Sequence, residues 1–317
     1  MNYKIGEKVA TREAYGRTLA ELGEGSDFVV LDADLAEATK TVYFGKAFPE
    51  RFFDCGIAEG NMIGIAAGLA AAGKIVVASS FAMFAAGRAF EQIRNSVAYP
   101  ALNVKVAATH AGITVGEDGA THQCLEDLAI MRVIPGMTVI NPADAVEAAE
   151  AIKTAINTEG PFYLRFGRYA VPVIHDQENY KFELGKGELL RDGSDVTIIA
   201  TGLMVSMALT AADTLAAEGI SARVINIHTV KPLDTAIIES AARETGALVT
   251  AEEHNIIGGL GSAVAEAVSE TYPVPVLRVG VEDKFGRSGK VPPLLEMYGL
   301  TPDAIADKAR SAVKLKS

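Results

Sequence analysis

Short apolar runs rich in β-branched residues alternate along the first half of the chain with alanine-rich segments of helical periodicity. The apolar runs cover residues 28–35, 74–80, 103–110, 137–142 and 161–166. The helical segments between them cover residues 12–22, 61–73, 89–99 and 145–156. An apolar run without alternation is typical of a strand buried on both faces, and strands that alternate with helices form parallel sheets. The pattern therefore predicts a parallel α/β layer.

A second unit of the same kind follows a break in the pattern. After Gly167 the periodicity lapses, in a segment that contains the polar stretch HDQENYKFELGKGE. Strand-like runs then resume at residues 195–202, 222–229, 247–254 and 274–281. We therefore predict an α/β protein with two doubly wound α/β domains, residues 1–175 and 191–317, joined by a linker at residues 176–190.

Composition and charge narrow the class of protein. The chain has 317 residues, is 49% hydrophobic and has a formal net charge of -11, which leaves no basic field for nucleic acid or an anionic membrane surface. Its cysteines, Cys55 and Cys124, form no CxxC pattern, so we expect neither a disulfide framework nor a structural zinc site. The longest small-apolar run, NMIGIAAGLAAAGKIVV, is broken by glycines, and MNYKIGEKVATREAYG contains no apolar signal-peptide core. We expect a cytoplasmic protein that binds neither nucleic acid nor a membrane.

Residues that can bind a ligand or take part in a reaction lie at the ends of several predicted strands. They are Asp34, Glu59, Phe81, Phe84 and His110. Ligands of open α/β sheets bind at the carboxyl ends of the strands, so we expect these side chains to lie on one rim. Taken alone, each also has a structural explanation, because acids suit the first turn of a helix and phenylalanines usually fill a core.

The stretch THAGITVGEDGATHQ, residues 109–123, concentrates titratable groups in a loop with few side chains to hold it. It contains two histidines, His110 and His122, and an acidic pair that includes Asp118. Its glycines let the backbone bend close to a bound molecule. A single histidine is usually a structural one, but two in one such loop favour a binding or catalytic role.

Small residues recur at every fourth position in the predicted helix after Glu59. Gly60, Gly64, Gly68 and Ala72 lie on one helical face with almost no side chains, although each interior glycine costs about 1 kcal/mol relative to alanine. The face therefore allows a close approach, either by the chain's own sheet or by a helix of another subunit. In the second case Glu59 lies beside an interface.

The stretches DADL, GIAEGNM, SSFAMF, THAGITVGEDGATHQ and LRFGR together resemble the carboxyl-terminal half of transketolase. The resemblance spans essentially the whole chain and implies a pyrimidine-binding domain at residues 1–175 and a transketolase C-terminal domain at residues 191–317. Other thiamine-diphosphate enzymes, the 2-oxoacid dehydrogenase E1 β subunit and deoxyxylulose-phosphate synthase, share this layout, but GEDGATHQ favours transketolase. Many prokaryotes divide transketolase into two chains, and MNYKIGEKVATREAYG is similar to the beginning of the second chain.

The resemblance implies thiamine diphosphate as the cofactor. In the family one glutamate hydrogen-bonds to the ring nitrogen N1′ of the aminopyrimidine and promotes the tautomer that deprotonates C2 of the thiazolium; Glu59 matches that glutamate. Phe81 and Phe84 match aromatic residues that pack against the aminopyrimidine, and Phe84 is the expected stacking partner. Gly87 stands where other members have a further aromatic residue.

The same resemblance implies a sugar substrate. A ketose is cleaved between C2 and C3 and its two-carbon unit passes to an aldose, so fixed hydrogen-bonding groups are needed around oxygens that gain charge. By resemblance, His122 contacts the oxygens of the carbonyl and of the two-carbon intermediate, and Asp118 recognises the hydroxyl that sets the stereochemistry. His110 and Arg168 hold the far phosphate, and Arg12 assists them.

One departure from the family concerns the far end of the substrate. Transketolases usually have a phosphate-binding serine after DADL, where this chain has Ala38. Thr39 or Thr41 is a candidate replacement; otherwise the substrate has a different terminus, such as a sulfonate or an unphosphorylated carbon. The donor and acceptor sugars therefore stay open, whereas the reaction type does not depend on them.

The GDG motif and downstream asparagine that hold magnesium and the diphosphate in this family do not occur in the sequence. In transketolases this machinery lies on the other half. The resemblance therefore implies a partner chain with the Mg2+ site and an α2β2 assembly, in which this chain also associates with itself through the helix after Glu59. We expect no metal ligand on this chain.

Two other functions are compatible with the predicted fold. One is the β subunit of a 2-oxoacid dehydrogenase E1 component, which decarboxylates a 2-oxoacid and docks a lipoyl acyltransferase. Asp118 and Arg168 disfavour it, because a 2-oxoacid has no sugar hydroxyl or phosphate to recognise. The other is a non-catalytic scaffold subunit, which the joint presence of Glu59, His110 and His122 disfavours. The second domain is expected to be chiefly structural.

Overall fold

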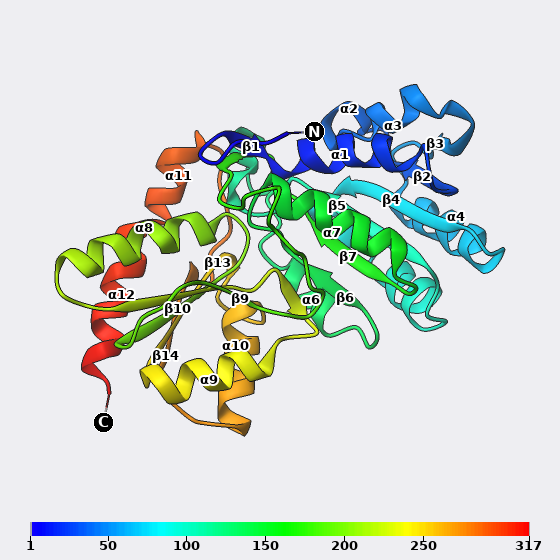
Figure 1. Cartoon of the computed structure of the whole chain (residues 1–317). Helices are drawn as coiled ribbons and strands as arrows, with labels where there is room; N and C mark the ends of the chain where they lie inside the picture. Colours follow the sequence, from blue (N-terminus) through cyan, green and yellow to red (C-terminus); the bar gives the residue numbers. More distant parts are fainter. Residues whose placement is uncertain (1, 317) are drawn as a thin grey trace.

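The chain forms two layered α/β units that lie against each other, the first in blue to green and the second in yellow-green to red (Figure 1). A computed structural model describes residues 2–316. Each unit is built on one main sheet with helices on both faces. The fold class predicted from the sequence, two doubly wound α/β domains, is confirmed.

The first unit contains the strands β1 (Lys8–Ala10), β2 (Phe28–Asp32), β3 (Phe52–Asp54), β4 (Ile75–Phe81), β5 (Val104–Thr109), β6 (Thr138–Ile140), β7 (Phe162–Arg165) and β8 (Ala170–Pro172). Its α-helices are α1 (Thr11–Leu22), α2 (Ala36–Thr39), α3 (Val42–Ala47), α4 (Glu59–Ala71), α5 (Phe90–Gln92), α6 (Asp127–Arg132) and α7 (Ala145–Asn157). Its other helical segments are the 3-10 turns η1 (Pro49–Arg51) and η4 (Ile113–Asp118) and the π-helical segments η2 (Met83–Arg88) and η3 (Ile93–Ala98).

The second unit contains the strands β9 (Glu188–Arg191), β10 (Val196–Ala200), β11 (Ala222–Asn226), β12 (Thr229–Lys231), β13 (Leu248–Asn255) and β14 (Val276–Val281). Its helices are α8 (Met204–Ala217), α9 (Thr235–Thr245), α10 (Leu260–Glu270), α11 (Val291–Met297) and α12 (Pro302–Lys314). The strand order is β12-β6-β7-β5-β4-β2-β3 in the first sheet and β14-β13-β10-β11-β9 in the second, and β1 pairs with β8 in a separate ribbon.

Successive residues of the central strands face opposite helical layers, because side chains along a strand alternate between its two faces. Along β4, Val76 and Ala78 pack with α4 and the π-helical segments, whereas Val77 packs with α1 and α7. Both faces of the strand are therefore buried. This explains why the sequence shows an unbroken apolar run here and not an alternating one.

Two sequence predictions fail in detail at the sheet edges. The apolar run at residues 222–229 is not one strand: β11 stays in the second sheet, while β12 crosses over and pairs antiparallel with β6. The strand β9 begins inside the segment for which we predicted a linker and pairs antiparallel with β11. Each sheet thus has an antiparallel edge strand, and β12 ties the two units together.

The helix predicted at residues 89–99 is only partly α-helical. The short helix α5 lies between η2 and η3, which are π-helical. The spacing of apolar residues does not distinguish the two forms over so few turns. Because π turns are rare and frequently occur at functional sites, it is relevant that η2 contains Phe84.

Helix α4 exposes its glycine face, which decides between the two interpretations of that face. A Cβ added at Gly64 or Gly68 would have no heavy atom within 4 Å. Ile57 and Ile65, which are 76% and 39% exposed, lie nearby in sequence, and α4 lies at the end of the first unit away from the second (Figure 1). The glycines do not pack on the chain's own sheet and leave the face free for another chain.

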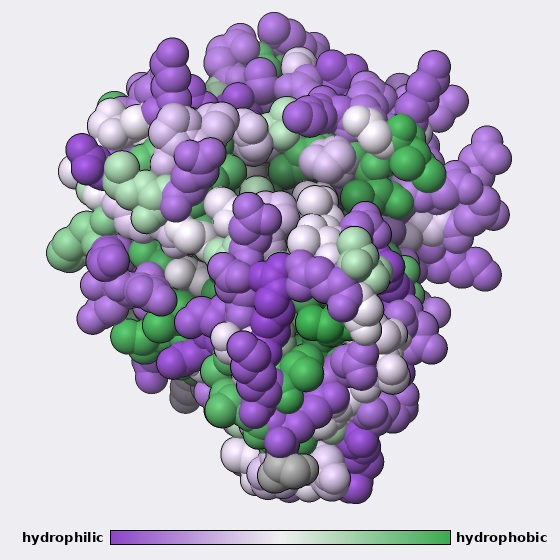
Figure 2. Space-filling model, turned by 90° about the vertical axis from the view of Figure 1, so that its left-hand side faces the viewer, coloured by the Kyte–Doolittle hydropathy of each residue, from purple (hydrophilic) through white to green (hydrophobic). Residues whose placement is uncertain are grey.

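The surface of the second unit is mostly polar where Figure 2 shows it. This view faces the side formed by α8, α11 and α12; hydrophilic side chains cover most of it, with smaller hydrophobic patches between them. The large apolar clusters lie inside, on the two faces of each sheet. Within residues 2–316 no helix is long and apolar enough to cross a membrane.

Candidate active site

Glu59 is the first residue of α4 and is buried, with 1% of its surface exposed. Two side chains donate to its carboxylate: Ser80 Oγ to Oε1 at 3.2 Å and Arg88 Nη1 to Oε2 at 2.7 Å. Ser80 belongs to β4 and Arg88 to η2, so the acid lies at the carboxyl end of β4 as expected. The N-terminus of a helix favours a negative charge at this place.

Four rings form a continuous cluster at the same end of the sheet. The rings of Phe81 and His110 stack with centres 3.8 Å apart, and those of Phe81 and Phe84 with centres 6.0 Å apart. The ring of His122 stands edge-on to Phe84 at 5.1 Å. The structure thus brings together both predicted cofactor-packing residues and both histidines of the loop.

His110 is neutral and its tautomer follows from its neighbours. Its Nε2 lies 2.9 Å from Arg12 Nη1, and its Nδ1 lies 2.9 Å from Thr109 Oγ1. Since a guanidinium only donates, Nε2 accepts and Nδ1 holds the proton. Burial, together with the charges of Arg12 and Arg168, lowers the pKa of His110 to about 2. The positive charge at this end of the site therefore comes from the arginines.

The two predicted phosphate-binding arginines lie on the same side of the cluster. Arg12 Nη1 also donates to the carbonyl of Ala38 at 2.8 Å; burial and the charge of Arg168 lower the pKa of Arg12. Arg168 Nη1 donates to the carbonyl of Val115 at 2.7 Å and to Asp118 Oδ2 at 3.1 Å. Asp118 and Arg168 therefore form a partly exposed ion pair within the predicted substrate region.

Neither threonine near Ala38 replaces the missing serine. The hydroxyls of Thr39 and Thr41 are buried and donate to Asp32 Oδ2 at 2.7 Å and 2.8 Å. Burial raises the pKa of Asp32 to about 6, against the effect of these hydrogen bonds. Both hydroxyls point into the protein, and Ala38 has no hydroxyl. None of these three side chains therefore offers a ligand a hydrogen-bond donor at this position.

Asp34 helps to shape the turn after β2. Its backbone lies in the left-handed region, with φ of 62°, and its amide donates to Asp54 Oδ1 at 3.0 Å. One residue further on, the amide of Leu35 donates to Asp32 Oδ1 at 2.7 Å. The acids of DADL thus direct the chain into α2, which precedes the contact between Ala38 and Arg12.

The loop from His110 to Gln123 is held by the second domain, which the sequence did not indicate. Glu253 on β13 accepts from the amide of Thr114 at 2.7 Å. A Cβ at Gly112, whose φ is +81°, would lie 2.2 Å from the Glu253 carboxyl carbon. Gln123 Nε2 donates to the carbonyl of Arg287 at 3.0 Å. The position of Glu253 at the end of a predicted strand was the one signal available.

A buried ion pair supports this contact between the domains. Arg165 Nε donates to Asp127 Oδ2 at 2.8 Å, and Arg165 Nη2 donates to the carbonyl of Glu253 at 2.9 Å. Tyr163 donates to the same Asp127 oxygen at 2.8 Å. Burial raises the pKa of the Glu253 carboxyl to about 7, against the effect of Arg165. The loop that contains both site histidines is thereby fixed from two sides.

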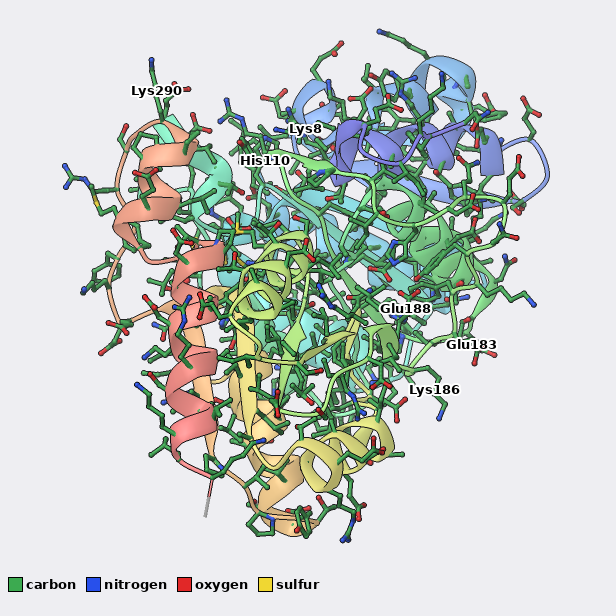
Figure 3. The ribbon with its side chains drawn as sticks, turned by 60° about the vertical axis from the view of Figure 1, so that its left-hand side comes forward. Lys8, His110, Glu183, Lys186, Glu188 and Lys290 are labelled. Carbon is green, nitrogen blue, oxygen red and sulfur yellow. The ribbon has the colours of Figure 1, made fainter. Side chains whose placement is uncertain are left out.

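Glu147, His175 and Glu188 have the spacing of metal ligands, but their chemistry does not fit a metal. His175 Nε2 lies 2.9 Å from Glu188 Oε2. Although burial lowers it, the ion pair with Asp144 and the hydrogen bond to Glu188 raise the pKa of His175 to about 10. The Glu147 carboxylate already accepts from Tyr180 and Asn226, so a metal would have to break these buried contacts. Glu188 also lies well away from His110 in the view of Figure 3.

Comparison with known proteins identifies the class. The family model described as the transketolase pyrimidine-binding domain matches residues 7–173, and the one described as the transketolase C-terminal domain matches residues 185–305. These two domains in one chain define the transketolase-like class of enzymes, which uses thiamine diphosphate. The chain belongs to the transketolase family and is a half-subunit of it, corresponding to the C-terminal part.

Individual relatives agree with this assignment over their whole lengths. A protein of Methanocaldococcus jannaschii named as a transketolase C-terminal section is 53% identical over 96% of this chain and 96% of its own. The 6-deoxy-6-sulfo-D-fructose transketolase subunit SqwH of Clostridium sp. strain MSTE9 is 48% identical over 96% and 95%. A solved structure described as a split-gene transketolase, inactive β4 tetramer, has a TM-score of 0.90 and 54% identity over 98% and 100%. These relatives favour transketolase over the E1 β subunit.

Proposed function

We propose that this chain supplies the aminopyrimidine-binding and sugar-binding half of a two-chain transketolase, which transfers a two-carbon ketol unit from a ketose to an aldose. The observation that most supports this is the buried Glu59 carboxylate beside the ring cluster of Phe84, Phe81 and His110. Such an arrangement fits a flat ring that needs one hydrogen bond at its edge. Thiamine diphosphate, when bound, supplies the nucleophilic C2 carbanion.

In this proposal the chain's own residues bind and orient. Glu59 hydrogen-bonds to N1′ of the aminopyrimidine, and Phe81 and Phe84 hold the ring in place. His122 Nδ1 lies 2.9 Å from Thr121 Oγ1, whereas its Nε2 has no partner among residues 2–316 and is free to contact a substrate oxygen. Asp118 recognises a sugar hydroxyl next to it.

The substrate has an anionic terminus in this proposal. Arg12 and Arg168 are guanidinium groups that can donate in pairs to a three-oxygen anion, and His110 contributes an imidazole held in one tautomer. Because Ala38 adds no hydroxyl, the site does not demand the serine contact of other transketolases, and both a phosphate and a sulfonate fit. One relative is named for 6-deoxy-6-sulfo-D-fructose. We propose pentose phosphates and sulfosugars as the two substrate classes to compare.

The proposal also requires a partner chain in the cytoplasm. That partner, an N-terminal transketolase subunit, binds the diphosphate and Mg2+, while the exposed glycine face of α4 pairs two copies of this chain in an α2β2 assembly. The structural relative described as an inactive β4 tetramer agrees with a chain that associates with itself and needs its other half for activity.

The test begins with the tagged chain captured from a lysate of its own host, with co-purifying proteins identified by mass spectrometry. We expect a stoichiometric protein with a GDG-type motif. The reconstituted complex should transfer two-carbon units only with thiamine diphosphate and Mg2+, and phosphorylated and sulfonated ketoses are compared by kcat/KM. Recovery of a lipoyl acyltransferase would replace the proposal by the E1 β subunit, and a complex inactive on all ketoses would favour the scaffold.

A further inference from the structure

Arg88 makes two contacts in the region where the aminopyrimidine is expected. Its Nη1 donates to Glu59 Oε2 at 2.7 Å, and its guanidinium carbon lies 4.5 Å from the centre of the Phe84 ring. The Glu59 carboxylate and the Phe84 face are the two features that the proposed function assigns to the cofactor ring. Arg88 was not among the residues expected at the site.

A guanidinium resembles an aminopyrimidine in the respects that matter here. Both are flat, nitrogen-rich groups that lie on an aromatic face and share a hydrogen bond with a carboxyl group. Arg88 occupies one face of the Phe84 ring and the Oε2 atom of Glu59. An aminopyrimidine that stacks on the same face and hydrogen-bonds to the same oxygen has to displace the guanidinium.

We propose that Arg88 occupies the aminopyrimidine position of the cofactor-free chain and is displaced when the cofactor binds. This inference rests on the proposed function. Without the guanidinium, the carboxylate of Glu59 would keep one side-chain donor among residues 2–316, the hydroxyl of Ser80. A buried charge without a charged partner is costly. Arg88 thus stabilises Glu59 while the site has no cofactor, and it must move away when the aminopyrimidine arrives.

The surroundings of Arg88 allow this movement. Half of its side-chain surface, 50%, is exposed, whereas Glu59 is 1% exposed. Arg88 is the last residue of η2 and follows the exposed Gly87. A Cβ at Gly87 would meet only the terminal methyl of Met83, at 2.5 Å. The guanidinium can therefore turn toward solvent without displacing core side chains.

The first test measures the dissociation constant of thiamine diphosphate for the complex of this chain with its partner, by isothermal titration calorimetry at saturating Mg2+. Arg88→Gln should bind the cofactor about three- to tenfold more tightly than the wild type, because no contact has to be displaced. Arg94→Gln, which removes an exposed arginine from the neighbouring segment η3, is the matched control and should bind as the wild type does.

A double-mutant cycle shows whether the effect acts through Glu59. In a Glu59→Gln background, Arg88→Gln should change the dissociation constant by less than about twofold, because the ion pair is already lost. Arg88→Lys keeps the charge but lacks the flat face, so it should give a smaller gain; it replaces Arg88→Gln if that variant does not fold.

An unchanged or higher dissociation constant in both Arg88 variants would overturn the inference and make Arg88 a supporting residue of the bound cofactor. A gain of equal size in the Glu59→Gln background would also overturn it. A wild-type complex that binds no thiamine diphosphate would instead refute the proposed function on which the inference rests, so the two failures are distinguishable.

Discussion

Glu59 and Glu147 are both buried acids in the first turn of a helix of the first domain, yet their surroundings differ. Glu59 is 1% exposed and Glu147 is 0% exposed. Glu59 accepts from Ser80 at 3.2 Å and from the half-exposed Arg88. Glu147 accepts from the hydroxyl of Tyr180, from Asn226 Nδ2 and from the amide of Ala143, at 2.6, 2.8 and 2.6 Å. Burial alone therefore does not mark a functional acid.

The difference lies in how many donors each carboxylate has and whether they can leave. The donors to Glu147 come from three places, the loop before α7, the connecting segment and β11 of the second domain. A ligand or metal would have to break several buried hydrogen bonds there. Within residues 2–316 a single charged side chain, Arg88, pairs with Glu59, and half of that side chain is exposed. Glu147 therefore joins the two domains, whereas Glu59 is left accessible for the proposed chemistry.

The comparison is tested most strongly by Glu59→Gln. This substitution keeps the shape but removes the acid, so kcat of the reconstituted enzyme should fall by roughly 10²- to 10⁴-fold, the range for a general acid or base. Cofactor binding, measured by calorimetry, should persist. Glu91→Gln, an exposed acid of α5, serves as the control and should leave kcat unchanged. A loss below tenfold in Glu59→Gln would contradict the assignment.

Glu147→Gln should act on stability and not on chemistry. The substitution replaces one carboxylate oxygen by an NH2 group, so the hydrogen-bond donors that face this oxygen lose their acceptor. A buried unsatisfied donor costs about 1–3 kcal/mol. We expect the free energy of unfolding in urea to fall by about 2–4 kcal/mol, with kcat per folded molecule unchanged. Glu150→Gln, one turn on, breaks a partly exposed pair with Lys153 and should cost less than about 0.5 kcal/mol. Equal losses in the two variants would show that Glu147 is not a special site.

The pH dependence of stability examines the same region through His175. The ion pair with Asp144 and the hydrogen bond to Glu188 outweigh burial and raise its pKa to about 10, whereas its unfolded value is about 6.5. The stabilisation is fully present below pH 6.5 and is lost as the pH rises through about 10, because the unfolded state releases its proton first. The free energy of unfolding should fall by roughly 1–3 kcal/mol between pH 7 and pH 9.

The matched variant for this pH profile is His175→Gln, which cannot titrate. Its profile over the same range should be flatter by the amount that His175 contributes. Asp144 should dominate at the acid end, because the ion pair with His175 and hydrogen bonds from backbone amides outweigh burial and hold its pKa below the usual range. Its stabilisation is present above the unfolded pKa and disappears as the pH falls through the folded one. A His175→Gln profile as steep as that of the wild type would assign the alkaline loss to another group.

The smallest effect concerns the loop that the second domain holds. Gly112→Ala should place a Cβ against Glu253 and strain a left-handed backbone, whereas Gly136→Ala has a φ of +72° but open space around it. We expect Gly112→Ala to cost about 1–2 kcal/mol more than Gly136→Ala in unfolding free energy. It should also raise KM for the ketose several-fold, because His110 and His122 lie on this loop. An unchanged KM would show that the contact between this loop and Glu253 serves stability alone.

Much of the fold could be predicted because local patterns determine it. The central strands are buried on both faces, so their apolar runs could be recognised without any knowledge of their neighbours. The positions of Glu59, Phe81 and His110 could be anticipated for the same reason, since residues that follow parallel strands meet at one edge. The rings of Phe81 and His110 do meet there, at 3.8 Å. The catalytic and binding roles of these residues stay predictions.

Features that depend on distant segments could not be predicted. The pairing of β12 with β6 joins residues of different domains, and no periodicity encodes which edge a strand of three residues will find. From the sequence Thr39 and Thr41 are candidates to replace the phosphate-binding serine, but both hydroxyls donate to the buried Asp32. Arg88 follows a glycine between a predicted strand and a predicted helix, and the π-helical segment η2 places it against Glu59.

The sequence by itself determined the two α/β layers, the family and the set of residues that meet at the strand ends, because these depend on side-chain periodicity and on short motifs. The tertiary structure alone decided how each polar group is satisfied. In the folded chain Arg88 pairs with Glu59, and Glu253 accepts a hydrogen bond from the loop that contains His110. Glu147 and His175 both bond to residues of the second domain. The physical reason is that a hydrogen bond or an ion pair is a property of two groups brought together by folding, and its strength depends on burial that no local pattern contains.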